Sequence, residues 1–435
     1  MLEFPKAKTT EEKLLFIYGF IGTMPIVEVL GFTGLTWLTL LMIGYLFFNG
    51  IKCKIKKATL PFIVFTLLTF VSSFICLVSG MDRMWKTIQI PNMIWQACFL
   101  IIFLNYYNRK GMQKCLFYIK GVYWASFAHA IWGILQLLIY EIAHVSINKV
   151  IFFDLMHVQM AEYVQMRGNG NSIAMTGFCW NAGNFAPLLV IGYVFSPSIY
   201  LKMLFAAVSI LSGSRTGIIG IITCVVVEVF FRLSKRHKKI KRTYIVGGGV
   251  ILLIAIVTIC SNSKLMGSIS HRIQEMMGTL SLDYLHTQSS STVHARYWTS
   301  VPIVTQWNGV LNNLFGYGNG CSGYPFAILY GQYDDHNWVV ECDYINNLWS
   351  FGYIGFALWY SWYGNHVFKG KKLDKKFLVL FLGLLVEGIT YNVTFNWCFL
   401  FLLFVFIEID YSNDFISGND VLITGEKKRA IIRNY

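Results

Sequence analysis

The pattern of apolar and polar positions divides the chain into long hydrophobic runs joined by short charged segments. A helix needs about 20 apolar residues to cross a hydrocarbon core of about 30 Å, and runs of that order recur along most of the sequence. We therefore expect an all-α, polytopic membrane protein with about twelve transmembrane helices. The expected helices cover residues 14–30, 33–49, 59–79, 89–106, 116–140, 173–195, 199–212, 216–233, 243–261, 345–365, 377–391 and 394–410, of which 199–212 and 377–391 are short.

Clusters of lysine and arginine between these runs predict the orientation of the helices, because basic segments stay on the cytoplasmic side. With twelve spans, every cluster falls on that side; the clusters lie at 52–57, 109–114, 235–242, 369–376 and 427–429. Both termini, including the tail 411–435, are then cytoplasmic. The outer face receives the segments 81–91, 141–172 and 212–215 and the largest polar loop, 262–344. The aromatic residues of that loop indicate short helices that cap a single membrane domain, 1–435.

Composition agrees with this topology and argues against a soluble globular domain or a nucleic-acid-binding protein. Of the 435 residues, 55% are hydrophobic and 13% are charged, which is far from the balance of a soluble globular domain. The net charge of +14 would suit nucleic acid, but the basic residues lie in the clusters that orient helices, so we expect no nucleic-acid binding. The charged N-terminus lacks the features of a cleavable signal peptide.

The ten cysteines show no CxxC spacing, and most of them fall in apolar runs. This distribution argues against a zinc site or a redox motif. Cys321 and Cys342 are the exception, because both fall in the large loop. If that loop is extracytoplasmic, they either form a disulfide or remain two free thiols.

Arg215 is the most informative single residue, because it stands in the turn SGSRTG, residues 212–217, between two apolar runs. A guanidinium at membrane depth costs roughly 3 kcal/mol or more, so such residues usually face a cavity and bind a ligand. The alternative is an arginine at a helix end that snorkels to lipid phosphates. The large loop adds the cations Arg272, His294 and Arg296. Two or three arginines in one cavity would suit a diphosphate, although a solvated loop charge explains Arg272 better.

Ionisable groups gather at the end of the large loop, directly before a membrane helix; they are Asp334, Asp335, His336, Glu341 and Asp343. At a membrane–water boundary a carboxylate or an imidazole can have a tuned pKa and accept a proton from a hydroxyl, a role worth roughly 10² to 10⁴ in rate. Asp334 and Asp335 are better explained as hydrated loop charges. The candidate catalytic residues are therefore Glu341, Asp343 and His336.

Four further sequence features bear on helix packing or ligand binding. Glu387 lies near the outer end of 377–391, where it either lines a cavity or pairs with an arginine. The stretch 181–187 brings two amides and a glycine into 173–195, which favours close helix packing and interhelical hydrogen bonds. Arg167 lies just before that helix and is a further candidate phosphate ligand. The glycine-rich stretch 316–320 lacks the strand and the Lys-Ser or Lys-Thr of a phosphate-binding loop and therefore indicates a tight turn.

Taken together and in this order, these stretches resemble the bacterial Wzy-type polysaccharide polymerases and the related O-antigen ligases. The resemblance rests on 177–186, 212–217, 296–298, 314–318 and 341–355, and it covers mainly residues 165–390. The Ser-Arg-Thr-Gly turn at 214–217 is its most specific part. Ligases usually carry a His-Asn pair eleven residues before the first glycine of a Gly-x-x-Gly, but counting back from Gly352 that position holds Glu341. The pair His336-Asn337 is displaced by five residues, so the chain is more similar to a polymerase.

The resemblance implies a GT-C-type glycosyltransferase whose donor and acceptor are oligosaccharides linked to polyprenyl (undecaprenyl) diphosphate, without a metal or other cofactor. Arg215 and Arg296, with Arg167, would bind the donor diphosphate, because fixed cations stabilise a departing anion. Glu341, with Asp343 or His336, would deprotonate the acceptor hydroxyl. The product would be O-antigen or capsular polysaccharide, made at the outer face of the bacterial cytoplasmic (inner) membrane, with membrane lipid, a flippase and a chain-length regulator as candidate partners.

Other functions fit part of the sequence. An O-antigen ligase of the same superfamily would use the same donor. A lipid-linked oligosaccharide flippase or another transporter would also need a cationic cavity, but the chain has no internal repeat and its candidate groups lie mostly in the large loop. A channel or a non-catalytic scaffold has little support, because the sequence offers no ring of pore-lining charges.

Overall fold

The computed structural model describes residues 6–30, 32–53, 55, 59–106, 109–162, 164, 173–212, 214–234, 290–330, 340–368, 375–389 and 391–393, and most of these are helical. The first part forms α1 (Thr10–Ile21), β1 (Glu28–Val29), β2 (Phe32–Thr33), α2 (Gly34–Phe48), α3 (Leu60–Val78), α4 (Arg83–Thr87), α5 (Gln89–Tyr106) and α6 (Arg109–Ala143). The middle part forms η2 (Lys149–Leu155), η3 (Gln159–Glu162), α7 (Ala182–Phe195), α8 (Ile199–Leu211) and α9 (Arg215–Ser234). The last part forms α12 (Ser290–Trp307), α13 (Val310–Phe315), α14 (Gly323–Tyr330), α15 (Asp343–Phe368) and α16 (Lys375–Glu387).

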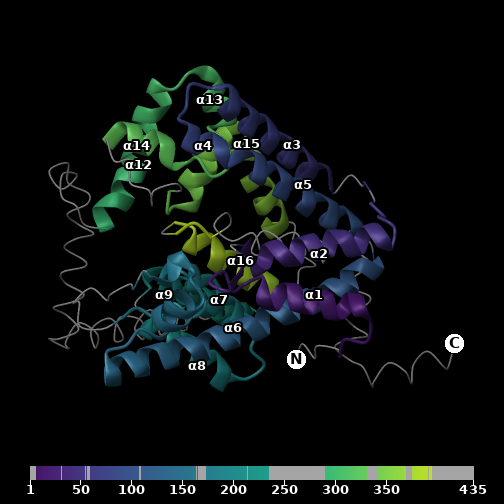
Figure 1. Ribbon diagram of the computed structural model, residues 1–435, viewed down its shortest axis with the longest axis vertical. Coiled ribbons are helices and arrows are strands. Elements are labelled where there is room, and N and C mark those ends of the chain that lie inside the picture. The colour runs from purple at the N-terminus through teal and green to yellow at the C-terminus, as the bar shows by residue number, and fades with distance from the viewer. Residues whose placement is uncertain are drawn as a thin grey trace.

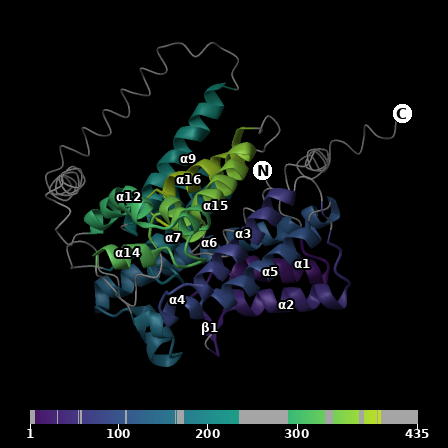
Figure 2. The same ribbon diagram turned by 90° about the horizontal axis from the view of Figure 1, so that it is seen from above.

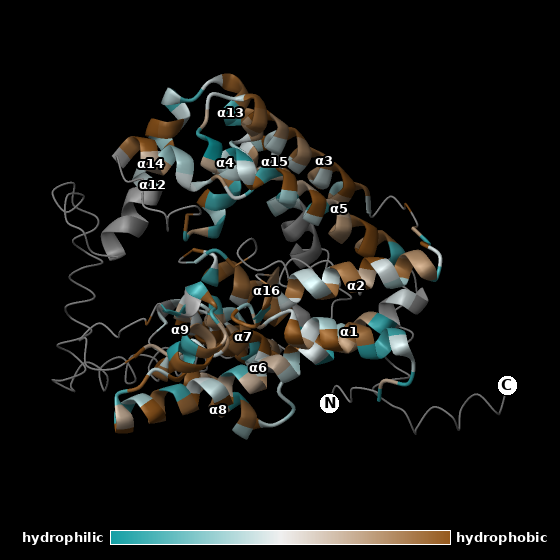
Figure 3. Cartoon of the chain, viewed as in Figure 1, coloured by the Kyte–Doolittle hydropathy of each residue, from teal (hydrophilic) through white to brown (hydrophobic). Residues whose placement is uncertain are grey.

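Three helical stretches among the described residues are long and apolar enough to cross a membrane; they are Leu60–Val78, Arg83–Tyr106 and Lys114–Ala143. Figure 3 shows the apolar colouring along α3 and α5. Shorter apolar helices include α7 with 14 residues and α8 with 13, whose rise of about 20 Å is less than a hydrocarbon core of about 30 Å. The mostly helical, membrane-compatible fold therefore agrees with the sequence. The expected helices 243–261 and 394–410 lie outside the described residues.

Several expected helices have different limits in the structure, and two of the differences have a clear local cause. α1 ends at Ile21 instead of residue 30, because Gly22 and Pro25 follow it and the chain turns into the antiparallel β1–β2 hairpin. α7 begins at Ala182 instead of residue 173, and Asn181 is its N-cap: the Asn181 Oδ1 accepts from the backbone N–H of Asn184 at 2.7 Å. The amides therefore begin this helix and do not interrupt it.

In the view of Figure 1 most helices form two groups and α16 lies toward the space between them, while Figure 2 shows α16 alongside α9 and α15. One group contains α6, α7, α8 and α9; in it α7 packs against α6, α8 and α9, and all but one of its residues are buried. The other group contains α3, α4, α5, α13 and α15. α16 packs against α7 and α9 of the first group, and the carbonyl of Gly388, directly after it, accepts from the backbone N–H of Asp343 at the start of α15, so the end of α16 reaches the second group.

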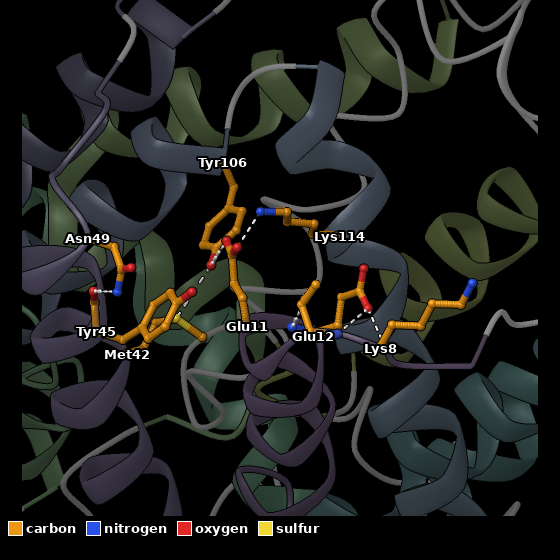
Figure 4. Close-up of polar contacts among 9 residues, drawn as sticks. Lys8, Glu11, Glu12, Met42, Tyr45, Asn49, Tyr106 and Lys114 are labelled. Carbon is orange, nitrogen blue, oxygen red and sulfur yellow. Dashed lines mark hydrogen bonds and ion pairs between the residues drawn. The ribbon is translucent and has the colours of Figure 1, made fainter.

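Charged and polar side chains hold α1 against α5 and α6 (Figure 4). Lys114 forms an ion pair with Glu11, and the Tyr106 hydroxyl donates to Glu11 Oε1 at 2.9 Å. Because the three residues come from the starts of α1 and α6 and the end of α5, one carboxylate ties three helices together. We name Glu11, Tyr106 and Lys114 the N-terminal cluster.

The described part of the large loop contains α12, α13 and α14, as the aromatic content predicts. The glycines of the 316–320 turn adopt positive φ angles of 79°, 110° and 80°, which confirms the tight turn. The backbone N–H of Tyr317 in this turn donates to the Trp349 carbonyl at 2.8 Å. That carbonyl belongs to α15 next to its break at Gly352, where φ is 66°. The 316–320 turn therefore fastens the large loop to α15 next to the break at Gly352.

Candidate functional site

Arg215 is the first residue of α9, and the turn before it is fixed by its own serines and glycine. The Ser214 Oγ accepts from the backbone N–H of Gly217 at 3.4 Å, which is the contact of an N-cap serine. A Cβ at Gly217 would lie 2.8 Å from Ser209 Oγ, so a side chain at this position would displace the end of α8. The Arg215 side chain is not among those that the structure describes. Its backbone stands at the positive end of the α9 dipole.

Glu387 is the last residue of α16 and contacts the same helix, α9. Its side chain is fully buried, and a Cβ at Gly220 would lie 2.6 Å from its Oε1 atom. Glycine at 220 thus gives the carboxyl group room to lie against the α9 backbone. An acid buried in an apolar helix is costly and usually marks a functional interior.

Asp343 is the first residue of α15 and is only 4% exposed. Its backbone N–H donates to the carbonyl of Gly388, directly after α16, at 2.9 Å. Its Oδ2 atom accepts from the Tyr360 hydroxyl at 3.1 Å and from Asn347 Nδ2 at 3.4 Å. Asp343 is therefore held in place by donors from its own helix, while its backbone joins the start of α15 to the end of α16.

The segment after α16 is pinned to the start of α7 through Tyr391. Its hydroxyl lies 2.9 Å from Asn181 Nδ2 and donates to the Asn184 Oδ1. A Cβ at Gly183 would overlap the Tyr391 ring. The close packing and interhelical hydrogen bonds that the stretch 181–187 predicts are thus present.

α12, which carries Arg296, reaches the start of α15 through an aromatic contact. The ring of Trp298 lies 6.4 Å from the ring of Tyr344, measured between centroids. The Tyr344 hydroxyl in turn donates to the Leu385 carbonyl of α16 at 2.7 Å. The side chain of Arg296 itself is not described, but its backbone position is two residues from Trp298 on the same helix.

These contacts bring the starts of α7 and α15 to the end of α16, which packs against the second turn of α9 at Gly220. We name Asn181, Arg215, Asp343, Glu387 and Tyr391 the helix-end site. Each of the three helix starts carries a partial positive charge, and backbone N–H groups at such ends bind phosphate and other anions. The positive helix ends suit an anionic ligand. A buried carboxylate beside them suits proton exchange.

Glu341 precedes this site by two residues, and part of the residue is exposed to solvent. Protein atoms around its carboxyl group nevertheless raise its pKa above the ordinary value of 4.5, because they withdraw the charged form from water. A carboxylate with a raised pKa is a stronger base than an ordinary glutamate. The predicted role of Glu341 as a proton acceptor is therefore compatible with its surroundings.

The other sequence-predicted residues are divided. Arg167 and His336, like Arg272, lie outside the described residues. Cys321 and Cys342 are both buried free thiols. No three metal-ligating side chains gather within the part of the chain that the structure describes.

The chain matches no model of a known protein family and no curated protein.

Sequence reasoning missed Tyr360 and Tyr391, which hold Asp343 and the start of α7. Both tyrosines lie in apolar, aromatic-rich stretches, where a hydroxyl gives little signal. Tyr391 could have been noticed, because Tyr391 and Asn392 form a polar step between the two expected helices 377–391 and 394–410.

Proposed function

We propose that the protein is a polysaccharide polymerase that joins oligosaccharide repeat units carried on polyprenyl diphosphate. The strongest support is a continuous set of contacts between α9 and α12. α9 packs against Glu387 of α16, Gly388 after α16 accepts from Asp343 of α15, and Tyr344 of α15 contacts Trp298 of α12. These contacts support a model in which Arg215, Arg296 and Glu341, which lie on or next to the elements so joined, act on one substrate. Two fixed cations and one basic carboxylate are the groups that a metal-independent glycosyl transfer needs.

In this proposal the donor diphosphate lies against the start of α9. The guanidinium of Arg215, the helix N-termini and Arg296 share the negative charge that develops on the diphosphate as it leaves. Arginine suits this role because its planar guanidinium donates two parallel hydrogen bonds and stays protonated throughout. The growing glycan remains on the lipid until the bond between its anomeric carbon and the diphosphate oxygen breaks.

Glu341 receives the proton of the acceptor. The hydroxyl oxygen of the incoming repeat unit forms the new bond to the anomeric carbon, its proton passes to the Glu341 carboxylate, and the diphosphate departs with the electron pair. Attack from the side opposite the diphosphate inverts the anomeric centre. Asp343 is a positioning residue, since its carboxylate is buried and accepts hydrogen bonds from Tyr360 and Asn347.

The same proposal includes the membrane topology. We infer about twelve spans in a GT-C-type architecture, cytoplasmic termini, and a site at the outer face of the bacterial cytoplasmic membrane. The three long apolar helices support membrane association, and the basic clusters support the orientation.

The decisive experiment is a glycan profile of cells in which Arg215→Ala replaces the wild-type protein. We expect long-chain polymer to disappear while single repeat units still reach their final acceptor, because loss of one such donor costs on the order of 10² to 10³ in rate. Arg83→Ala is the matched control, since Arg83 is an exposed arginine at the start of α4, on the face expected to be outer. That variant should leave the polymer unchanged.

Other outcomes identify other functions. Intact polymer that accumulates on the lipid carrier, with no delivery at all, would indicate a ligase. Unchanged long-chain glycan in Arg215→Ala would reject both enzymes. Accessibility labelling that places residue 215 on the cytoplasmic side would contradict the proposed site, because the substrates are expected at the outer face.

A further inference from the structure

Two cysteines that are 245 positions apart in the sequence lie against each other in the structure. Cys76 belongs to the last turn of α3, and Cys321 follows the 316–320 turn before α14. Both side chains are fully buried and belong to the same apolar cluster. Both sulfur atoms also approach a single acceptor, the carbonyl oxygen of Trp85, at 3.8 Å from Cys76 and 3.7 Å from Cys321.

The surrounding residues fix this approach. Gln89 Nε2 lies 3.0 Å from the Cys321 sulfur, 3.1 Å from the Trp85 carbonyl and 3.2 Å from the Asn319 carbonyl. A Cβ at Gly318 would lie 3.0 Å from the Cys76 Cβ, and the φ of 110° at this glycine is one that other residues avoid. The turn can therefore press its backbone onto the end of α3, which brings the two sulfurs to the same carbonyl.

We propose that Cys76 and Cys321 are a disulfide pair, oxidised when this end of α3 faces the cell exterior. This inference rests on the topology of the proposed function, because a disulfide persists in an oxidising compartment and not in the cytoplasm. Both S–H bonds break and one S–S bond forms. The two electrons and two protons pass to the disulfide of an extracytoplasmic thiol–disulfide oxidoreductase, which becomes a dithiol.

The pairing differs from the one that loop position suggests. Cys342 lies in the same apolar cluster as Cys321, but the thiol that approaches the same Trp85 carbonyl as Cys321 is that of Cys76. A Cys76–Cys321 bond would fasten the 316–320 turn to α3, and this turn already donates to the α15 carbonyls of Trp349 and Ser350. The disulfide would thus fasten both the 316–320 turn and α15 to the end of α3.

Differential thiol labelling of the full-length protein in membranes tests the pairing. Free thiols are blocked under denaturing conditions, the sample is reduced, and a maleimide-linked polyethylene glycol then counts the newly freed thiols on a gel. We expect the wild type to gain two labels upon reduction. Cys342→Ser should keep this gain, whereas Cys76→Ser and Cys321→Ser should lose it.

The wild-type result does not depend on how well the variants fold. A gain that Cys342→Ser abolishes and Cys76→Ser keeps would overturn the pairing. To separate topology from pairing, Asp82→Cys provides an exposed thiol just after α3 for a membrane-impermeant reagent. If the Asp82→Cys thiol is labelled from outside but the wild type gains no labels upon reduction, the disulfide alone is overturned. If the Asp82→Cys thiol is not labelled from outside and the wild type gains no labels, the disulfide and the proposed function are overturned together.

Discussion

The N-terminal cluster and the helix-end site both bring charged side chains to the ends of helices. In the N-terminal cluster the charges are matched, since Lys114 pairs with Glu11, and these side chains remain 35% and 14% exposed. In the helix-end site Glu387 is fully buried against the α9 backbone at Gly220, and Asp343 is 4% exposed and accepts hydrogen bonds from Tyr360 and Asn347 of its own helix. The first arrangement joins helices with a matched ion pair, whereas the second buries carboxyl groups where helix ends meet.

This difference separates structural charge from functional charge. A partly exposed ion pair contributes little to stability and costs little to make. A buried carboxyl group costs more to desolvate, so its presence calls for a function or a strong local partner. If the comparison is right, substitutions in and beside the helix-end site should change the rate of glycan transfer, and substitutions in the N-terminal cluster should change stability alone.

Glu341→Gln should produce the largest effect on the rate of transfer. The amide cannot accept the hydroxyl proton, so polymer formation in membranes supplied with lipid-linked repeat units should fall by roughly 10² to 10⁴. The thermal unfolding of the purified variant should match that of the wild type, because Glu341 is exposed.

The pH dependence of the wild type provides the check. Glu341 acts as a base only when ionised, so the rate should fall as the pH decreases through its pKa. Because surrounding protein raises that pKa above 4.5, the fall should occur at higher pH than for an ordinary glutamate. Glu341→Gln should lose this dependence; a residual rate that still falls in the same pH range would assign the base to another residue.

Much of the helical framework could be predicted from the sequence, and little of the site could. Expected helices 33–49 and 59–79 agree with α2 and α3 to within about one residue, because a run of apolar side chains is a local signal. The contact between Asp343 and Gly388, and that between Cys76 and Cys321, depend on which helices pack together. No local pattern records that choice, so loop position suggested only Cys342 as a partner for Cys321 and gave no signal for Cys76.

The glycines of the 316–320 turn and Asn181 were predictable only in part. The turn at 316–320 was predictable as a turn, but its partner, the break at Gly352, was not. Asn181 could be noticed as a polar residue in an apolar run, yet only the fold distinguishes an amide that interrupts a helix from one that begins it.

Asp343→Asn should have a smaller effect than Glu341→Gln. The amide keeps the shape of the side chain but weakens the hydrogen bonds from Tyr360 and Asn347, so we expect about a tenfold loss of kcat/KM, the equivalent of about 1.4 kcal/mol. The pH profile distinguishes positioning from proton transfer. Asp343→Asn should retain the acid limb that Glu341→Gln loses, and Tyr360→Phe should reproduce the loss in rate. If Asp343→Asn also abolished the limb, Asp343 would be part of the base.

Lys114→Ala should have the smallest effect, and it tests the other side of the comparison. Removing the partner of Glu11 should lower the stability of the detergent-solubilised protein by about 0.2 to 1 kcal/mol, because the pair is partly exposed and screened by salt. Lys8→Ala, which removes an equal charge from an exposed position near Glu12 (Figure 4), is the control and should leave thermal unfolding unchanged. Polymer formed per molecule of protein should equal the wild-type value in both variants. A loss of transfer in Lys114→Ala as large as that in Arg215→Ala would mean that the N-terminal cluster also belongs to the catalytic machinery, and the distinction between the two regions would fail.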